Sequence, residues 1–131
     1  MKDSKVYLIS ILVVFVFFSC STIDEKAIEV AGFYEANVVN GYYNFELQIS
    51  LDGNDDVLIE ALFDDYDFEL VRADLDNQGN GVIDFDIRSQ DVYGGALLRG
   101  DGEYFDGYLQ LDYSIDWGWE KVHYRIVAER Y

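Results

Sequence analysis

The sequence predicts an all-β protein whose main domain is an eight-stranded antiparallel β-barrel with up-and-down order. Apolar and polar residues alternate with a period of two along four segments, which is typical of antiparallel strands with one buried and one solvent-facing side. Short turn signals rich in Gly, Asn and Asp separate eight segments, and only residues 24–30 suggest a turn of helix. A meander of eight strands avoids exposed edges by closing on itself.

Composition excludes several classes of protein. The chain has 131 residues, which corresponds to one domain at about 100–200 residues per domain. Its 26 acidic and 9 basic side chains give a formal charge of −17, so the surface does not attract nucleic acid. Half of the residues are hydrophobic, which argues against disorder. One His and one Cys allow neither an all-protein His/Cys zinc site nor an internal disulfide, and we expect no cofactor.

Residues 1–19 have the features of a signal peptide. Lys2 and Lys5 form a positive start, and an apolar run follows over residues 6–18. At about 1.5 Å per residue this run is too short for a hydrocarbon core that needs about 20 residues. We therefore expect it to be the apolar part of a leader that is removed on export.

The end of this leader determines its type. Phe17-Phe18-Ser19-Cys20 resembles a bacterial lipobox, with a small residue before a Cys that becomes the first mature residue. Phe17 and Phe18 depart from the usual Leu and small residue, and such loose lipoboxes look like those of Bacteroidota lipoproteins. The resemblance implies that Cys20 carries acyl chains that anchor the protein in a membrane. Ser21 lacks the acidic character of an inner-membrane retention signal, which favours the outer membrane, on its periplasmic or its surface side. The alternative is an ordinary secretory signal cut near Ser19 that leaves Cys20 as a free thiol.

Residues 20–30 are expected to tether the anchor to the folded part. Removal of residues 1–19 takes away Lys2, Lys5 and Asp3 and leaves 7 basic and 25 acidic side chains, a formal charge of −18. Such a surface repels anionic headgroups, so the acyl chains alone are expected to hold the protein at the membrane.

The barrel domain is predicted over residues 31–131. The regular strands are expected at 42–51, 82–88, 107–116 and 122–130, and less regular strands at 32–39, 56–63, 68–76 and 96–104. Turn signals lie between them at 40–41, 52–55, 77–81, 94–95 and 106–107. Glu60 and Arg72 share faces with apolar neighbours, so the inward faces of their two strands are ambiguous.

A family resemblance adds to this pattern. Gly32-Phe33-Tyr34 looks like a weak version of the Gly-x-Trp start of lipocalins, and Arg130 ends the last strand where lipocalins often place an arginine that packs across that aromatic ring. The mature chain is similar in length and meander to lipocalin-like (calycin-type) lipoproteins of Bacteroidota. The resemblance implies a cup that binds a small apolar molecule, and the alternative is a barrel filled by its own side chains.

One loop resembles an EF-hand calcium loop. Asp76, Asn80 and Asp84 match its first, fifth and ninth positions, but Gln78 stands at the third and Ile87 where the bidentate Glu belongs. The flanks are predicted strands rather than helices. A Gly-rich hairpin explains the same residues, so the segment is only a weak calcium candidate and no other metal site is expected.

We expect no enzymatic activity. His123 is the only histidine and lies on the predicted outer face of the last strand, and the chain has no Gly-x-Ser-x-Gly elbow. Paired carboxylates are too abundant in so acidic a chain to indicate a glycosidase.

The loops at the barrel end opposite the tether are the candidate binding site. They contribute Asp64, Asp65, Tyr66, Asp67, Asp91, Tyr93, Trp117, Trp119 and Glu120. We expect a small hydrophobic or aromatic ligand at this mouth, contacted by Tyr66, Tyr93, Trp117, Trp119, Asp65 and Asp67. The alternative partner is a basic protein, with the chain acting as an inhibitor or immunity protein against an enzyme such as a lysozyme. Several lysozyme inhibitors are lipoproteins with similar barrels, and residues 100–104 faintly resemble their Ser-Gly-x-x-Tyr loop. Both Trp side chains could instead cap the barrel core.

Overall fold

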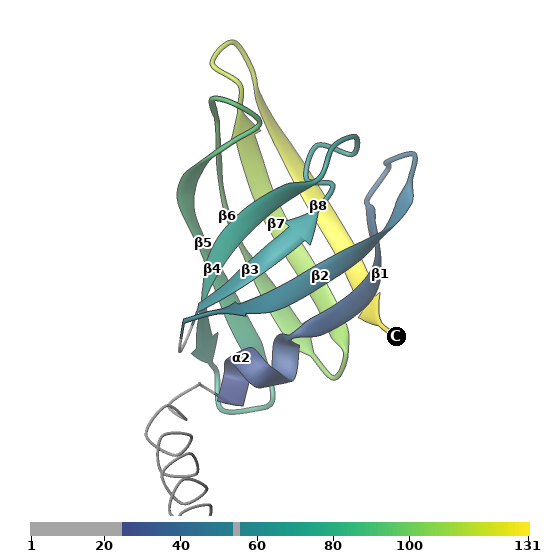
Figure 1. Ribbon diagram of the computed structural model, residues 1–131, viewed down its shortest axis with the longest axis vertical. Coiled ribbons are helices and arrows are strands. Elements are labelled where there is room, and N and C mark those ends of the chain that lie inside the picture. Colours follow the sequence, from purple (N-terminus) through teal and green to yellow (C-terminus); the bar gives the residue numbers. More distant parts are fainter. Residues whose placement is uncertain (1–24, 54–55) are drawn as a thin grey trace, which may run out of the picture.

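The computed structural model describes residues 25–53 and 56–131, which form one closed β-barrel (Figure 1). The strands follow one another around the barrel in chain order, every neighbouring pair is antiparallel, and β1 closes the barrel by pairing with β8. The elements are α2 (Glu25–Val30), β1 (Gly32–Val38), β2 (Asn44–Asp52), β3 (Asp56–Ala61), β4 (Glu69–Asn77), β5 (Ile83–Val92), β6 (Ala96–Phe105), β7 (Tyr108–Asp116) and β8 (Lys121–Arg130). The predicted all-β, eight-stranded up-and-down barrel is confirmed, and α2 occupies the predicted turn of helix.

Three predicted strand ends were wrong by two residues or more, and the third strand ends at Ala61 rather than at residue 63. The second strand begins at Asn44 rather than at Tyr42, because the chain turns through a left-handed residue before it and the Tyr42 amide bonds to the side chain of Asp65 instead of a strand. The fifth strand runs on to Val92 rather than ending at residue 88. Its pairing with β6 shifts register between Ile87 and Gln90, a bulge that interrupts the alternation.

Side chains fill the middle of the barrel. Each strand contributes at least one inward side chain that is at most 1% exposed: Tyr34, Leu47, Ile59, Val71, Phe85, Leu98, Leu111 and Ile126. A cavity wide enough for a ligand would leave the side chains around it accessible to water. At this level the barrel is therefore a packed core rather than a cup.

The two ambiguous strands have a clear register. β3 turns Val57, Ile59 and Ala61 inward, and β4 turns Val71 and Ala73 inward. Glu60 and Arg72 face water, so their charges carry no burial cost.

One end of the barrel, here called the proximal end, is closed by α2. Ala27 and Val30 of the helix are buried. Arg130 lies over the rings of Tyr34 and Tyr104, with its guanidinium carbon 5.3 and 5.7 Å from their centroids. Its Nη2 also donates to the carbonyl of Ala31 at 2.8 Å, and the Tyr34 hydroxyl donates to that of Val30 at 2.6 Å. These contacts join the first and last strands to the helix.

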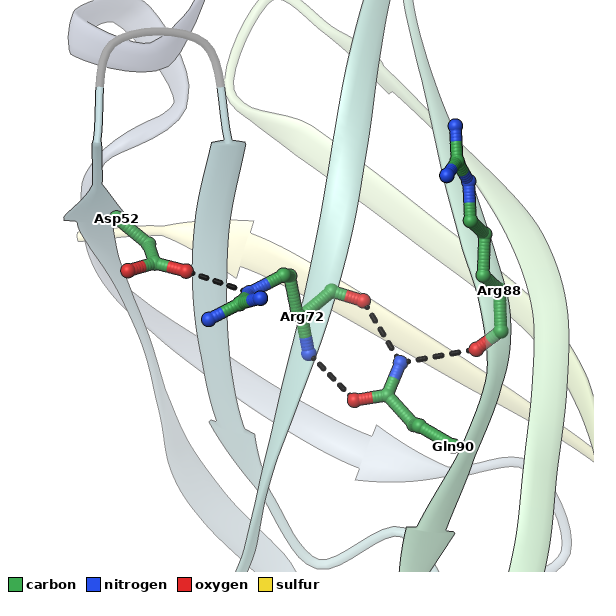
Figure 2. A network of polar contacts seen from close by, with 4 residues as sticks. All are labelled: Asp52, Arg72, Arg88 and Gln90. Carbon is green, nitrogen blue, oxygen red and sulfur yellow. Dashed lines mark hydrogen bonds and ion pairs between the residues drawn. The ribbon is translucent and has the colours of Figure 1, made fainter.

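The pairing of β4 with β5 extends only from the proximal end to Asp74 and Asp86. Beyond this point the side chain of Gln90 replaces the missing backbone bonds (Figure 2). Its carbonyl oxygen accepts from the Arg72 amide, and its nitrogen donates to the carbonyls of Arg72 and Arg88, at 2.9–3.0 Å. One amide side chain therefore spans this seam between two strands.

Carboxylates face one another across the outer wall. Five aspartates pair in register on β3 to β7, and we call them the acidic row: Asp56, Asp74, Asp86, Asp101 and Asp112. Like charges directly opposite each other are unfavourable. Arginines on the same wall offset part of this repulsion, with Arg88 at 3.0 Å from Asp74 and Arg125 at 2.6 Å from Asp112.

Candidate functional site

The distal end, opposite α2, is formed by four loops: residues 39–43, 62–68, 93–95 and 117–120 (Figure 1). Aromatic and acidic residues make up most of them, and they contain no Lys, Arg or His. The turns expected to meet at this end therefore do so. The exposed carboxylates at this end could attract a cationic group.

The loop over residues 62–68 covers the mouth of the barrel. Phe63 is 0% exposed and points into the core, where its ring meets that of Tyr113 edge-to-face at 5.3 Å. The Tyr113 hydroxyl donates to the Phe63 carbonyl at 2.6 Å. Burial raises the pKa of Tyr113 far above its usual value, so this hydroxyl stays a donor. Phe63 is thus a plug at the distal end.

The same loop is held by its own turn and by Tyr93. Oδ1 of Asp64 accepts from the amides of Tyr66 and Asp67 at 2.9 Å, which tightens the turn. The Tyr93 hydroxyl donates to the Asp67 carbonyl at 2.6 Å and accepts from the Asp64 amide at 3.2 Å. Burial also raises the pKa of Tyr93. Asp64 and Tyr93 therefore fix the loop.

Asp65 has a different surrounding from the one predicted. It is only 6% exposed, and its Oδ2 accepts from the Tyr42 amide at 2.9 Å, which joins two distal loops. Its Oδ1 is buried and has no hydrogen-bond partner among the described residues. A side chain at position 41 would collide with this carboxylate, which explains the need for Gly41. The buried carboxylate of Asp65 therefore joins these two loops, and its role in ligand binding stays a prediction.

Two groups of aromatic rings flank the plugged mouth. The tyrosine cluster consists of Tyr42, Tyr43 and Tyr66, with successive ring centroids 6.5 and 6.4 Å apart. On the other side the tryptophan stack consists of Tyr93, Trp117 and Trp119, with spacings of 5.8 and 6.3 Å and interplanar angles of 30° and 27°. Together these rings form an aromatic surface at the end of the barrel.

The predicted site residues divide by exposure. Tyr66, Asp67 and Trp119 face water, and Trp119 is 82% exposed. Trp117 and Tyr93 are half-buried and pack against the core, so only one of the two tryptophans caps it. Of the other predicted rim acids, Asp91 and Glu120 are exposed.

The sequence reasoning missed Tyr42, Tyr43 and Phe63. The two tyrosines were assigned to a strand, although their position directly after Asn40-Gly41 could have placed them in the turn. Phe63 was assigned to the end of a strand, and its role depends on a contact with Tyr113, fifty residues away, that no local pattern reveals.

The weak calcium candidate lies in the hairpin between β4 and β5. Asn77 and Asn80 use their side-chain oxygens to accept from the amides of Gly79 and Val82. Asp84 accepts from the side chain of Gln78, and Asp76 lies opposite Asp84 in the register. No group of three or more His, Cys, Asp or Glu residues within 25–53 and 56–131 is arranged to hold a metal. Calcium binding stays a prediction.

His123 lies on the outer wall, away from the mouth. It is opposite Ser114 on β7, which is in turn opposite Arg99 on β6. These residues line an open hollow of about 800 Å³ on the outside of β5 to β8. No hydrogen bond joins Ser114 to His123 in the described structure. Residues 100–104, which faintly resemble an inhibitor loop, lie inside β6 rather than in a loop.

Comparison of the chain with known protein families, with characterised proteins and with solved structures finds no match. Within the described residues, no helix is long and apolar enough to cross a bilayer. The predicted signal peptide over 1–19 and Cys20 lie outside the described part of the chain. The architecture is an eight-stranded antiparallel barrel that is compatible with a lipocalin-like fold.

Proposed function

We propose that this protein is a non-enzymatic binding protein whose distal end recognises a basic protein. The observation that carries the proposal is the exposure of Trp119 and Tyr42, 82% and 81%, at an end of the barrel whose four loops together hold carboxylates and no cation. Large aromatic side chains dominate the energetic centres of protein interfaces. Stacked rings beside carboxylates suit Lys and Arg side chains, which bind aromatic faces and carboxylates alike.

A small apolar ligand in the mouth is the second candidate. Phe63 occupies that position, and the side chains beneath it fill the barrel. A ligand in the mouth would therefore have to displace Phe63 and break the bond to Tyr113. The surface formed by the tyrosine cluster and the tryptophan stack needs no such rearrangement, which favours protein recognition.

We also propose that the chain is a lipocalin-like lipoprotein of the Bacteroidota type, anchored in the outer membrane through Cys20. The apolar run over 6–18 and the Ser19-Cys20 junction support the anchor. Arg130 packs across Tyr34, as the resemblance to lipocalins implies, which supports the family. The described chain begins at the proximal end, so an anchor at Cys20 would leave the distal end free for a partner.

The test is calorimetric titration of the protein with a lysozyme and a panel of other basic proteins. We expect binding that weakens steeply from low to high salt, because exposed charges are screened. Trp119→Ala should weaken it by about 30-fold, the ~2 kcal/mol typical of an interface hot spot. Tyr108→Ala, at the proximal end and also exposed, is the matched control and should have no effect.

Unchanged binding in Trp119→Ala would show that the tryptophan stack is not the site. Native mass spectrometry distinguishes the small apolar ligand from protein recognition. A small-molecule adduct that is lost on denaturation would favour a ligand in the mouth. Binding that does not respond to salt would also favour an apolar ligand.

A further inference from the structure

Exposed aromatic side chains also lie at the proximal end, far from the candidate site. The proximal aromatic arc consists of Phe33, Phe105, Tyr108 and Tyr131, each about half exposed or more. Phe105 and Tyr108 are opposite each other at the ends of β6 and β7, and the amide of Tyr131 donates to the Phe33 carbonyl at 3.4 Å. The four residues therefore follow the ends of β6, β7, β8 and β1, which are consecutive around the barrel.

Most of the rest of the proximal end is polar, and its exposed apolar side chains are Ile28 of α2 and Leu51 near the end of β2. The turn after β2 is flanked by Asp52 and Asp56, and the loop after β4 over residues 78–82 consists mainly of Gln, Gly and Asn. The arc is thus the group of exposed aromatic rings on one side of this end.

The chain enters the barrel at the same end. Glu25 opens α2, and Cys20 precedes it by five residues, a span of at most about 18 Å when extended. An anchor on Cys20 would keep the start of α2 within this short distance of the bilayer surface, with the proximal end of the barrel facing the membrane.

We propose that the proximal aromatic arc lies in the interfacial layer of the bilayer that holds the anchor. The ends of β6, β7, β8 and β1 then contact the membrane. The proposal rests on the proposed lipid anchor. Tyr and Phe rings suit the boundary between headgroups and acyl chains, since Tyr has an apolar body and a polar tip. Asp106 and Glu129 lie beside the arc, so it fits zwitterionic headgroups and not anionic ones.

The test uses tryptophan fluorescence of the full lipidated chain in phosphatidylcholine vesicles with acyl chains brominated close to the headgroup. The chain has two native tryptophans, Trp117 and Trp119, both at the distal end. Phe105→Trp adds one in the arc. Leu97→Trp is the matched control, because Leu97 is exposed on the same face of β6 about 27 Å away.

In Phe105→Trp we expect the brominated lipid to quench the fluorescence of the added tryptophan but not that of the two native tryptophans. The fluorescence of Leu97→Trp and of the wild type should not be quenched. Absence of quenching in Phe105→Trp that sediments with the vesicles would overturn the proposal, and so would equal quenching in Leu97→Trp. A doubled mass without lipid, together with a blue shift of the added tryptophan, would assign the arc to a second copy of the chain instead.

Failure of the anchor has a different result. A chain that does not sediment with vesicles would refute lipidation of Cys20. Coupling the Cys20 thiol to a maleimide-bearing lipid then supplies the anchor chemically, and the same quenching measurement decides the role of the arc.

Discussion

Replacing Phe63 by Ala tests the plug at the distal end. Truncation of a buried Phe costs about 3–5 kcal/mol, which includes the cavity left behind. The edge-to-face contact with Tyr113 belongs to this loss and is worth about 0.5–1.5 kcal/mol. Because Phe63 lies on a loop that can partly collapse, we expect the lower end, about 3 kcal/mol, in urea unfolding followed by circular dichroism. For a domain of this size the melting temperature should fall by roughly 15 °C.

Phe68→Ala is the matched control, since Phe68 lies on the same loop but is half exposed and touches only the edge of the core through Phe45. Its loss should stay below about 1 kcal/mol, as is usual for surface sites. Equal losses in the two variants would refute the reasoning, because they would mean that Phe63 is not buried in solution. A small aromatic compound that stabilises Phe63→Ala but not the wild type would show that the mouth takes a ligand only when the plug is removed.

Charge and pH supply three further predictions. Asp101→Asn removes a charge between Asp86 and Asp112 and should raise the free energy of unfolding by about 0.2–1 kcal/mol at low salt, a gain that disappears at high salt. Desolvation raises the pKa of Asp112, but bonds from Arg125 and a neighbouring amide lower it more, so Arg125→Gln should cost less than about 1 kcal/mol at pH 7. This cost should be constant above about pH 4 and should disappear only as the pH falls through the lowered pKa of folded Asp112; a cost that persists at still lower pH would contradict the ion pair. Burial raises the pKa of Tyr113, so its contribution holds below about pH 10 and is lost as the pH rises further. Tyr113→Phe should therefore lose less stability than the wild type between about pH 9 and 12, and a parallel loss would count against burial of the hydroxyl.

The sequence predicted the fold because each strand carries its own signal. In β7, Leu109, Leu111 and Tyr113 alternate with polar residues, and the structure buries these three. The signal was weaker where an outward side chain is flanked by apolar ones on the same face. Leu58 and Leu70 beside Glu60 and Arg72 made the inward faces of β3 and β4 uncertain until the pairing with neighbouring strands settled them.

The distal end could be predicted in composition but not in geometry. Strand order alone brings Tyr66, Trp117 and Trp119 to one end of the barrel. The burial of Asp65 and Phe63 follows from contacts with Tyr42 and Tyr113, which are distant in sequence. A period-two pattern cannot reveal such contacts, because the residues of a loop do not alternate between two faces.

The pairing of β1 with β8 determines when the barrel can close during folding. Tyr34 lies opposite Arg130, and this arginine also holds α2. A chain that emerges with its N-terminus first can pair β1 with β2 early, but the second edge of β1 stays open until β8 has emerged. The ring then closes in one late step over a sequence separation close to the whole domain, which is intrinsically slow. Until that step the chain is an open sheet with two exposed edges, a form prone to pair with other chains.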